Sequence, residues 1–136
     1  MTAYVRFRVA DEAYAVSVLN VLEVAGLGEV TPVPGAPREI LGVRNLRGKI
    51  LPVIDLAALL GARRTEPPTR LLVAESDGRQ AGLAIDEVTE VGEFGEFADP
   101  AEEADSALLL GTMLEEGDLI GVLNMPAVMD ALGVPA

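Results

Sequence analysis

The sequence predicts an all-β protein of two small β-barrels in tandem, packed together, with short helices that include one at the C-terminus. Two observations support this fold class. The predicted strands are short, alternate apolar with polar residues, and are separated by tight-turn signals such as Asp77-Gly78. The second half of the chain also repeats the first half in order and spacing. At 136 residues, half of them apolar, the chain suits one packed domain.

The predicted strands begin near the N-terminus. Residues 4–9 alternate polar with apolar side chains, and a turn at 11–12 leads into a second strand at 14–18. Residues 71–75 and 81–85, joined by a turn at 76–78, repeat this hairpin. Each half ends in a predicted short helix, capped by Asp55 in the first half and by Asn124 in the second.

Two shifts align the halves. A shift of 67 places residues 15–24 on 82–91, and a shift of 69 places residues 48–59 on 117–128. Order and spacing persist along nearly the whole chain, which favours an internal duplication. We predict a single domain at 1–136, with a first barrel at 1–61 and a second at 70–136. This boundary is approximate, because such barrels can exchange strands.

Charge is distributed unevenly between the halves. Residues 1–64 carry eight Lys/Arg and six Asp/Glu, whereas residues 65–136 carry two Arg and sixteen Asp/Glu. The acidic half is either a solubilising surface or a docking face. It repels nucleic acid and anionic lipid, so we expect no nucleic-acid partner. The chain has no signal-peptide core and no apolar run of about 20 residues, so we expect a cytoplasmic protein without direct membrane insertion.

The residue inventory argues against catalysis. The chain has no His and no Cys, which excludes thiol nucleophiles, His-based triads and the usual zinc sites. A paired-carboxylate hydrolase remains an alternative, although aromatic residues are few. Asp99, Glu102, Glu103 and Asp105 could hold calcium weakly, but they lack EF-hand order and suit a solvated loop. We therefore predict a protein that is not an enzyme, with no cofactor and no metal.

The run GVRNLRGKILPVIDL at 42–56 concentrates three of the ten positive charges, at Arg44, Arg47 and Lys49. In the second copy Met113 replaces Arg44 and Glu116 replaces Arg47. A barrel of this kind can therefore close without these arginines. Their role is either specific to the first copy or that of ordinary solvated charges.

This run resembles the central signature of the CheW-like coupling proteins of bacterial chemotaxis. It contains Gly-Val-x-Asn-Leu-Arg-Gly followed by Pro-Val-x-Asp-Leu, and Pro34 and Pro37 precede it. Residues 14–16, 21–24, 81–85 and 128–132 also match, so the resemblance covers essentially the full length. Arg44 departs from the pattern, because the family usually has an apolar or small residue there.

The resemblance implies two SH3-like five-stranded barrels and a non-enzymatic adaptor. Such adaptors join the cytoplasmic tip of chemoreceptors to the regulatory domain of a CheA-type histidine kinase, within receptor arrays at the membrane. The alternative is a diverged adaptor that serves another two-component or regulatory system.

The resemblance also suggests which residues bind partners. Arg47 matches the signature arginine and Glu23 the acidic residue of the preceding strand, positions associated with receptor and kinase coupling in the family. The planar guanidinium suits a carboxylate, so we predict a Glu23–Arg47 pair. Asn45, in the same signature run, completes the polar part of the predicted site.

The apolar part of the predicted site consists of Val18, Val21 and Val88. These valines are candidates for a groove between the barrels that accepts a receptor helix. The alternative interpretation places them in the barrel core.

Overall fold

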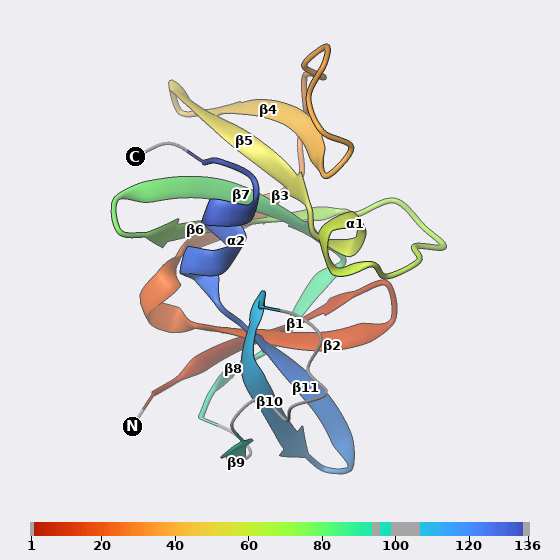
Figure 1. The fold of residues 1–136 in the computed structure, drawn as a ribbon, viewed down its shortest axis with the longest axis vertical. Helices are drawn as coiled ribbons and strands as arrows, with labels where there is room; N and C mark the ends of the chain where they lie inside the picture. The colour runs from red at the N-terminus through yellow and green to blue at the C-terminus, as the bar shows by residue number, and fades with distance from the viewer. Residues whose placement is uncertain (1, 94–95, 99–106, 135–136) are drawn as a thin grey trace.

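The computed structural model of the chain describes residues 2–93, 96–98 and 107–134, and its fold is mainly β (Figure 1). The elements, in chain order, are β1 Tyr4–Val9, β2 Glu12–Ser17, the 3-10 helix η1 Val18–Asn20, β3 Val21–Gly26, β4 Ile40–Leu46, β5 Lys49–Asp55, α1 Leu56–Leu60, β6 Arg70–Ser76, β7 Arg79–Ile85, β8 Glu87–Gly92, β9 Glu96–Ala98, β10 Leu109–Glu115, β11 Asp118–Leu123 and α2 Met125–Ala131.

The strands form two sheets. One has the order β3-β6-β7-β5-β4, and the other has the order β8-β1-β2-β11-β10-β9. The predicted fold class, two small SH3-like barrels with short helices, is confirmed, and β9 adds a sixth strand to the second sheet. We call the barrel with β3, β4 and β5 the first barrel, and the barrel with β8, β10 and β11 the second barrel.

Each barrel takes strands from both halves of the chain. The N-terminal hairpin β1–β2 lies in the second barrel, and the hairpin β6–β7 lies in the first. Neither 1–61 nor 70–136 therefore supplies all the strands of one sheet. The exchange is reciprocal: β5 runs parallel to β7 in the first barrel, as β11 runs parallel to β2 in the second.

The register of the strands reproduces the internal duplication. Val53 pairs with Gly82 in the first barrel, and its counterpart Val122 pairs with Ala15 in the second, as the shifts of 69 and 67 require. The strand register also shifts at equivalent points, between residues 40 and 42 in the first barrel and between residues 109 and 111 in the second. The two sheets therefore share one strand order.

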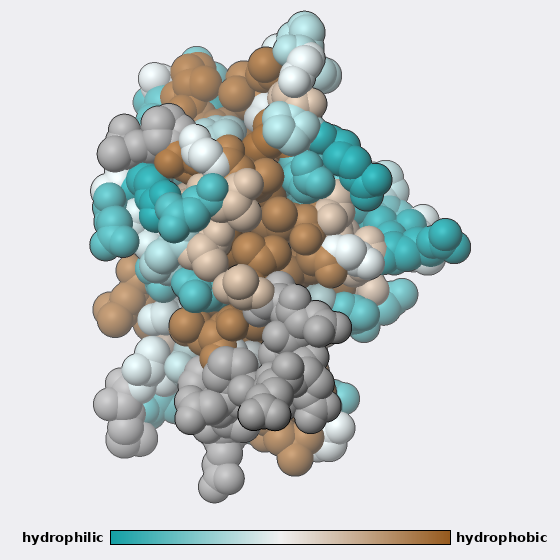
Figure 2. All heavy atoms as spheres, viewed as in Figure 1, coloured by the Kyte–Doolittle hydropathy of each residue, from teal (hydrophilic) through white to brown (hydrophobic). Residues whose placement is uncertain are grey.

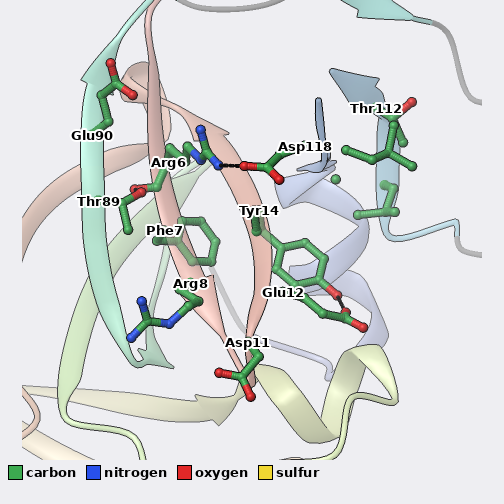
Figure 3. A pocket seen from close by; sticks show the side chains of 14 residues that line it. Arg6, Phe7, Arg8, Asp11, Glu12, Tyr14, Thr89, Glu90, Thr112 and Asp118 are labelled. Carbon is green, nitrogen blue, oxygen red and sulfur yellow. Dashed lines mark hydrogen bonds and ion pairs between the residues drawn. The ribbon is translucent and has the colours of Figure 1, made fainter. Parts of the chain in front are cut away.

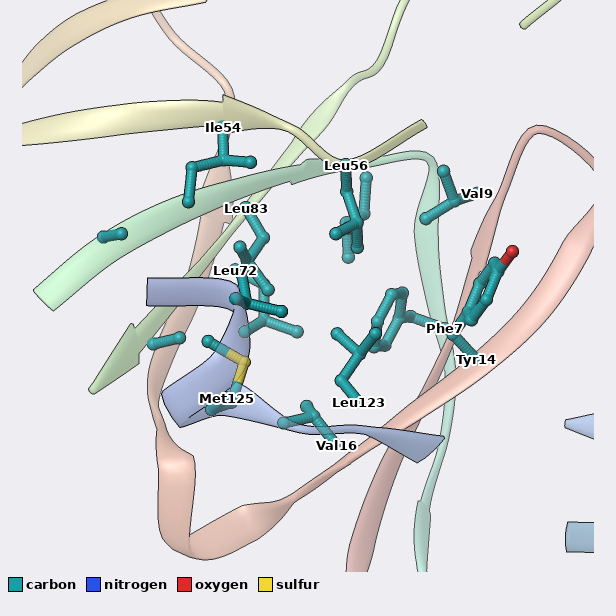
Figure 4. Close-up of a cluster of buried hydrophobic side chains, with 14 of the residues drawn as sticks. Phe7, Val9, Tyr14, Val16, Ile54, Leu56, Leu72, Leu83, Leu123 and Met125 are labelled. Carbon is teal, nitrogen blue, oxygen red and sulfur yellow. The ribbon is translucent and has the colours of Figure 1, made fainter. Parts of the chain in front are cut away.

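The largest apolar cluster lies between the barrels and contains side chains from both sheets and both helices (Figure 4). Phe7, Leu72 and Leu123 are among its fully buried members. Each barrel adds a smaller interior, around Leu51 and Val53 in the first and around Ile120 and Val122 in the second. The two barrels therefore share the core on which both depend.

Both predicted helices are confirmed at their predicted starts. The Asp55 side chain accepts a hydrogen bond from the Ala58 N–H at 3.3 Å, and Asn124 accepts one from the Ala127 N–H at 3.2 Å. Each side chain satisfies an N–H that has no partner within the first turn of its helix.

Gly42, the first residue of the signature run, lies where the β3–β4 connection crosses β4. Its φ is 150°, and a Cβ there would lie 2.1 Å from the Thr31 backbone oxygen.

We predict that Gly42→Ala lowers the free energy of unfolding by about 2 kcal/mol or more, because the backbone at Thr31 would have to move away from the added Cβ. Gly26→Ala, with open space around it, is the control. Equal urea-unfolding curves for the two variants would contradict this prediction.

The exchange of strands predicts that the halves do not fold separately. Fragments 1–62 and 66–136 should each be largely unfolded alone, because each lacks strands of both sheets. Mixing them should restore the native far-ultraviolet circular dichroism and the dispersed amide spectrum of the intact chain. A folded 1–62 fragment on its own would refute the prediction.

Candidate functional site

The signature run forms the β4–β5 hairpin, which lies at one end of the molecule, opposite the β10–β11 hairpin (Figure 1). Its turn residues Arg47 and Gly48 have φ of 52° and 86°, as a type I′ hairpin turn requires. The Asn45 Oδ1 accepts a hydrogen bond from the Gly48 N–H at 2.8 Å. The structure thus assigns Asn45 to shaping the turn that presents Arg47.

The predicted Glu23–Arg47 pair is confirmed. The Arg47 Nη2 donates a hydrogen bond to the Glu23 Oε2. Arg47 lies in the turn after β4 and Glu23 lies on β3, so this ion pair links the two edge strands of the sheet. The Arg47 side chain is 68% exposed and Glu23 is 31% exposed, so solvent screens the pair and its contribution to stability is small. The pair therefore fixes the direction of a guanidinium that stays accessible.

The second barrel has the same turn without the same pair. Glu116 and Gly117 have φ of 49° and 86°, nearly the values at Arg47 and Gly48. The counterpart of Glu23 is Glu90, so a Glu90–Glu116 contact would be repulsive. Each barrel therefore presents a similar backbone with the opposite charge at its tip.

Another arginine serves the second barrel. The Arg6 Nη2 lies 3.1 Å from the Asp118 Oδ2, and Arg6 is the cross-strand neighbour of Glu90. The Arg6 side chain is largely buried, whereas Asp118 is exposed. This ion pair joins β1 to the start of β11. The internal repeat did not predict it, because the residue that corresponds to Arg6 in the other copy is the uncharged Val73.

The structure brings Val18, Val21 and Val88 to the margin of the shared core, where all three are half-buried. Val24 and Val91 lie on the same strands as Val21 and Val88 and are 42% and 62% exposed. Our sequence reasoning omitted these two as site residues, although the shift of 67 pairs them. Leu19 and Leu22 are also exposed nearby in the chain. Apolar side chains also gather over the two helices, on the face in Figure 2.

A cleft of about 700 Å³ lies beside the second barrel (Figure 3). Four of its lining residues form two pairs: Arg6 forms an ion pair with Asp118, and the Tyr14 hydroxyl donates a hydrogen bond to the Glu12 carboxylate at 2.6 Å. Burial, together with this hydrogen bond and the charge of Glu12, raises the pKa of Tyr14 well above its usual value. The Tyr14 hydroxyl therefore stays protonated and acts as a hydrogen-bond donor to Glu12, not as a nucleophile.

The described part of the chain has dispersed acidic side chains and short helices. Its Asp and Glu side chains form no group of three that could hold an ion. Asp99, Glu102, Glu103 and Asp105 lie outside the described residues. None of the described helices has the length and apolar character needed to cross a bilayer.

The family model of the CheW-like domain matches residues 3–133. The chain belongs to the CheW-like family. The CheW-like fold is also seen in a solved relative, the scaffolding protein TtCheW from Thermoanaerobacter tengcongensis, which superposes with a TM-score of 0.82. The two are 32% identical, and the match covers 90% of this chain and 88% of that one.

Curated relatives of this CheW-like chain match over a shorter region. A chemotaxis protein CheW from Rhizobium meliloti is 41% identical over 87 residues, 62% of this chain and 56% of the relative. Protein FrzA from Myxococcus xanthus is 44% identical over 84 residues, 60% of this chain and 52% of the relative. The match thus spans about half the length of these relatives.

The Arg6–Asp118 pair of this CheW-like fold predicts an asymmetric response to mutation. Asp118→Asn should lower the free energy of unfolding by about 1 kcal/mol, because it leaves a largely buried cation with less compensation. Adding Arg6→Met should restore most of that loss, since Val73 shows that the position accepts an apolar residue. Chemical denaturation of both variants measures the effect, and an unchanged Asp118→Asn would contradict it.

Proposed function

We propose that the chain is a non-enzymatic adaptor that couples chemoreceptors to a CheA-type histidine kinase in chemotaxis or motility signalling. One observation carries the proposal: a full CheW-like fold presents an exposed Arg47, held by Glu23, at the tip of its first barrel. In this proposal the protein is cytoplasmic and is recruited to receptor arrays at the membrane.

Arg47 and Glu23 supply the polar contact of the proposed interface. A guanidinium offers planar N–H donors that match a carboxylate, and Arg47 uses Nη2 on Glu23 while two-thirds of its side chain faces solvent. A partner carboxylate can therefore reach Arg47 without displacing Glu23. Asn45 contributes indirectly, because it shapes the turn that carries Arg47.

Half-buried and exposed valines supply the apolar contact. Val18, Val21 and Val88 border the shared core, and Val24 and Val91 extend this apolar surface toward solvent. The apolar face of an amphipathic receptor helix would pack against these valines, as amphipathic helices do in apolar grooves. The acidic second barrel gives the adaptor an asymmetric charge, which favours one orientation of a bound partner.

Arg47→Glu tests the proposal. The substitution adds no backbone strain, because Glu116 adopts the same φ in the second barrel, so stability should change by about 0.5 kcal/mol or less. Binding to the kinase regulatory domain or to the receptor tip should weaken by about 2 kcal/mol or more, since a bidentate contact becomes a repulsion. Calorimetric titration of each partner and urea unfolding give the two quantities.

The matched control exchanges the charges of the pair. Glu23→Arg combined with Arg47→Glu restores an ion pair between β3 and the turn. It should recover part of the binding if the pair acts by holding the hairpin, and none if Arg47 touches the partner directly. Normal affinity of the folded fraction of Arg47→Glu for both partners would refute the site. A wild-type protein that binds neither would favour an adaptor of another regulatory system.

A further inference from the structure

Arg44 is a half-buried cation without an ion pair. Five of the ten Lys and Arg residues form ion pairs with described residues, and five do not. Arg44 is half-buried, and the other four cations without an ion pair are exposed: Arg38, Lys49, Arg63 and Arg70. Exposed cations are solvated by water, so within the described part of the chain only Arg44 has lost solvent without gaining a carboxylate.

The position of Arg44 is that of an interior side chain. It lies on β4 directly across from Leu51, which is 2% exposed in the interior of the first barrel. Its counterpart in the second barrel, Met113, is 1% exposed and packs in that barrel's interior. The second barrel thus holds an apolar side chain at the position where the first barrel has the Arg44 guanidinium.

The guanidinium lies against the β3–β4 connection. A Cβ at Gly28 would sit 2.6 Å from the Arg44 Nε and 2.9 Å from its Nη2, and Gly28 has a φ of 66°. The Arg44 Nη1 is buried and has no hydrogen-bond partner among the described residues. The backbone therefore leaves room for the guanidinium but supplies no acceptor for that nitrogen.

This arrangement costs stability. A buried donor without an acceptor lowers the stability of the folded protein, and partial desolvation of the charge lowers it further. Replacing a poorly compensated buried charge by an apolar residue is often neutral or stabilising. Met113 is the apolar solution in the same molecule, so the barrel interior does not require Arg44.

We propose that Arg44 is a recognition residue for a carboxylate on the protein partner. The inference rests on the proposed function and specifies the chemistry of its first-barrel contact. Arg44 lies three residues from Arg47 on one hairpin, a span of about 10 Å in extended chain. The two arginines together form a site for an acidic segment, in which Arg47 meets the segment at the surface and the half-buried Arg44 takes a carboxylate beside the β3–β4 connection.

Arg44→Met is the decisive variant, because it copies Met113. Its control is Arg70→Met, which removes an exposed, unpaired arginine and changes the net charge by the same amount. We expect Arg44→Met to unfold at an equal or higher temperature than wild type. We also expect its affinity for the kinase regulatory domain or the receptor cytoplasmic domain to fall about tenfold or more, as for a lost charged hydrogen bond. Arg70→Met should stay within about twofold of wild type.

The outcomes separate this inference from the proposed function. If wild type binds neither partner, the proposed function fails. If wild type binds and Arg44→Met binds equally well, Arg44 is satisfied by water alone and the inference is overturned. It is also overturned if Arg44→Met unfolds at a lower temperature and its folded fraction binds normally, since Arg44 would then be a support of the β3–β4 connection. If Arg44→Met and Arg70→Met lose the same affinity for the partner, the effect comes from the change in net charge alone, and the inference is overturned.

Discussion

The reciprocal exchange of strands between the two halves is the constraint on which the rest of the structure depends. The β1–β2 hairpin completes the second barrel and β6–β7 completes the first, so neither half can close a sheet alone. The apolar faces of these strands meet in the shared core, where Phe7, Leu72 and Leu123 are fully buried. The two tips, at opposite ends of the molecule, are therefore held in a fixed relation to each other.

On this duplicated frame, the two barrel tips differ in the charge of their side chains. The turns at Arg47-Gly48 and Glu116-Gly117 have nearly the same φ values, yet their charges are opposite. Glu23 has an arginine partner from the turn, whereas its counterpart Glu90 faces Arg6 from the neighbouring strand. A few substitutions in a duplicated barrel have thus produced one cationic tip and one acidic tip while the φ values of the two turns stayed nearly the same.

The sequence was sufficient for features that depend on local chemistry or on the repeat. The caps at Asp55 and Asn124 follow from the side chains themselves. The Glu23–Arg47 pair followed from the family signature and the complementary chemistry of its two groups. The exchange of strands between the halves left no signal in any one segment. The apolar residues of β5 would be buried equally well against β7 or against a strand of its own half. Long-range pairing between similar strands is decided by the whole fold, not by any one segment.

The remaining misses concern burial within a barrel. The sequence made Val21 and Val88 candidates for an apolar groove, with the barrel core as the alternative, but it could not show that they border the core while Val24 and Val91 remain exposed. That difference arises from the twist and closure of the sheets, which no single strand encodes. The Arg6–Asp118 pair and the burial of Arg44 were hidden for the same reason, since each depends on which strands face one another across a barrel.

The Glu23–Arg47 pair is too exposed to contribute much stability, and its value lies in the geometry that it fixes. A free arginine side chain loses up to about 2 kcal/mol of rotamer entropy when a partner orders it. Glu23 restricts Arg47 before any partner arrives, and the Asn45–Gly48 hydrogen bond fixes the turn beneath it. Part of the ordering cost is thereby met in the folded protein, so in the proposed interface a partner's carboxylate would meet a guanidinium whose direction is already fixed.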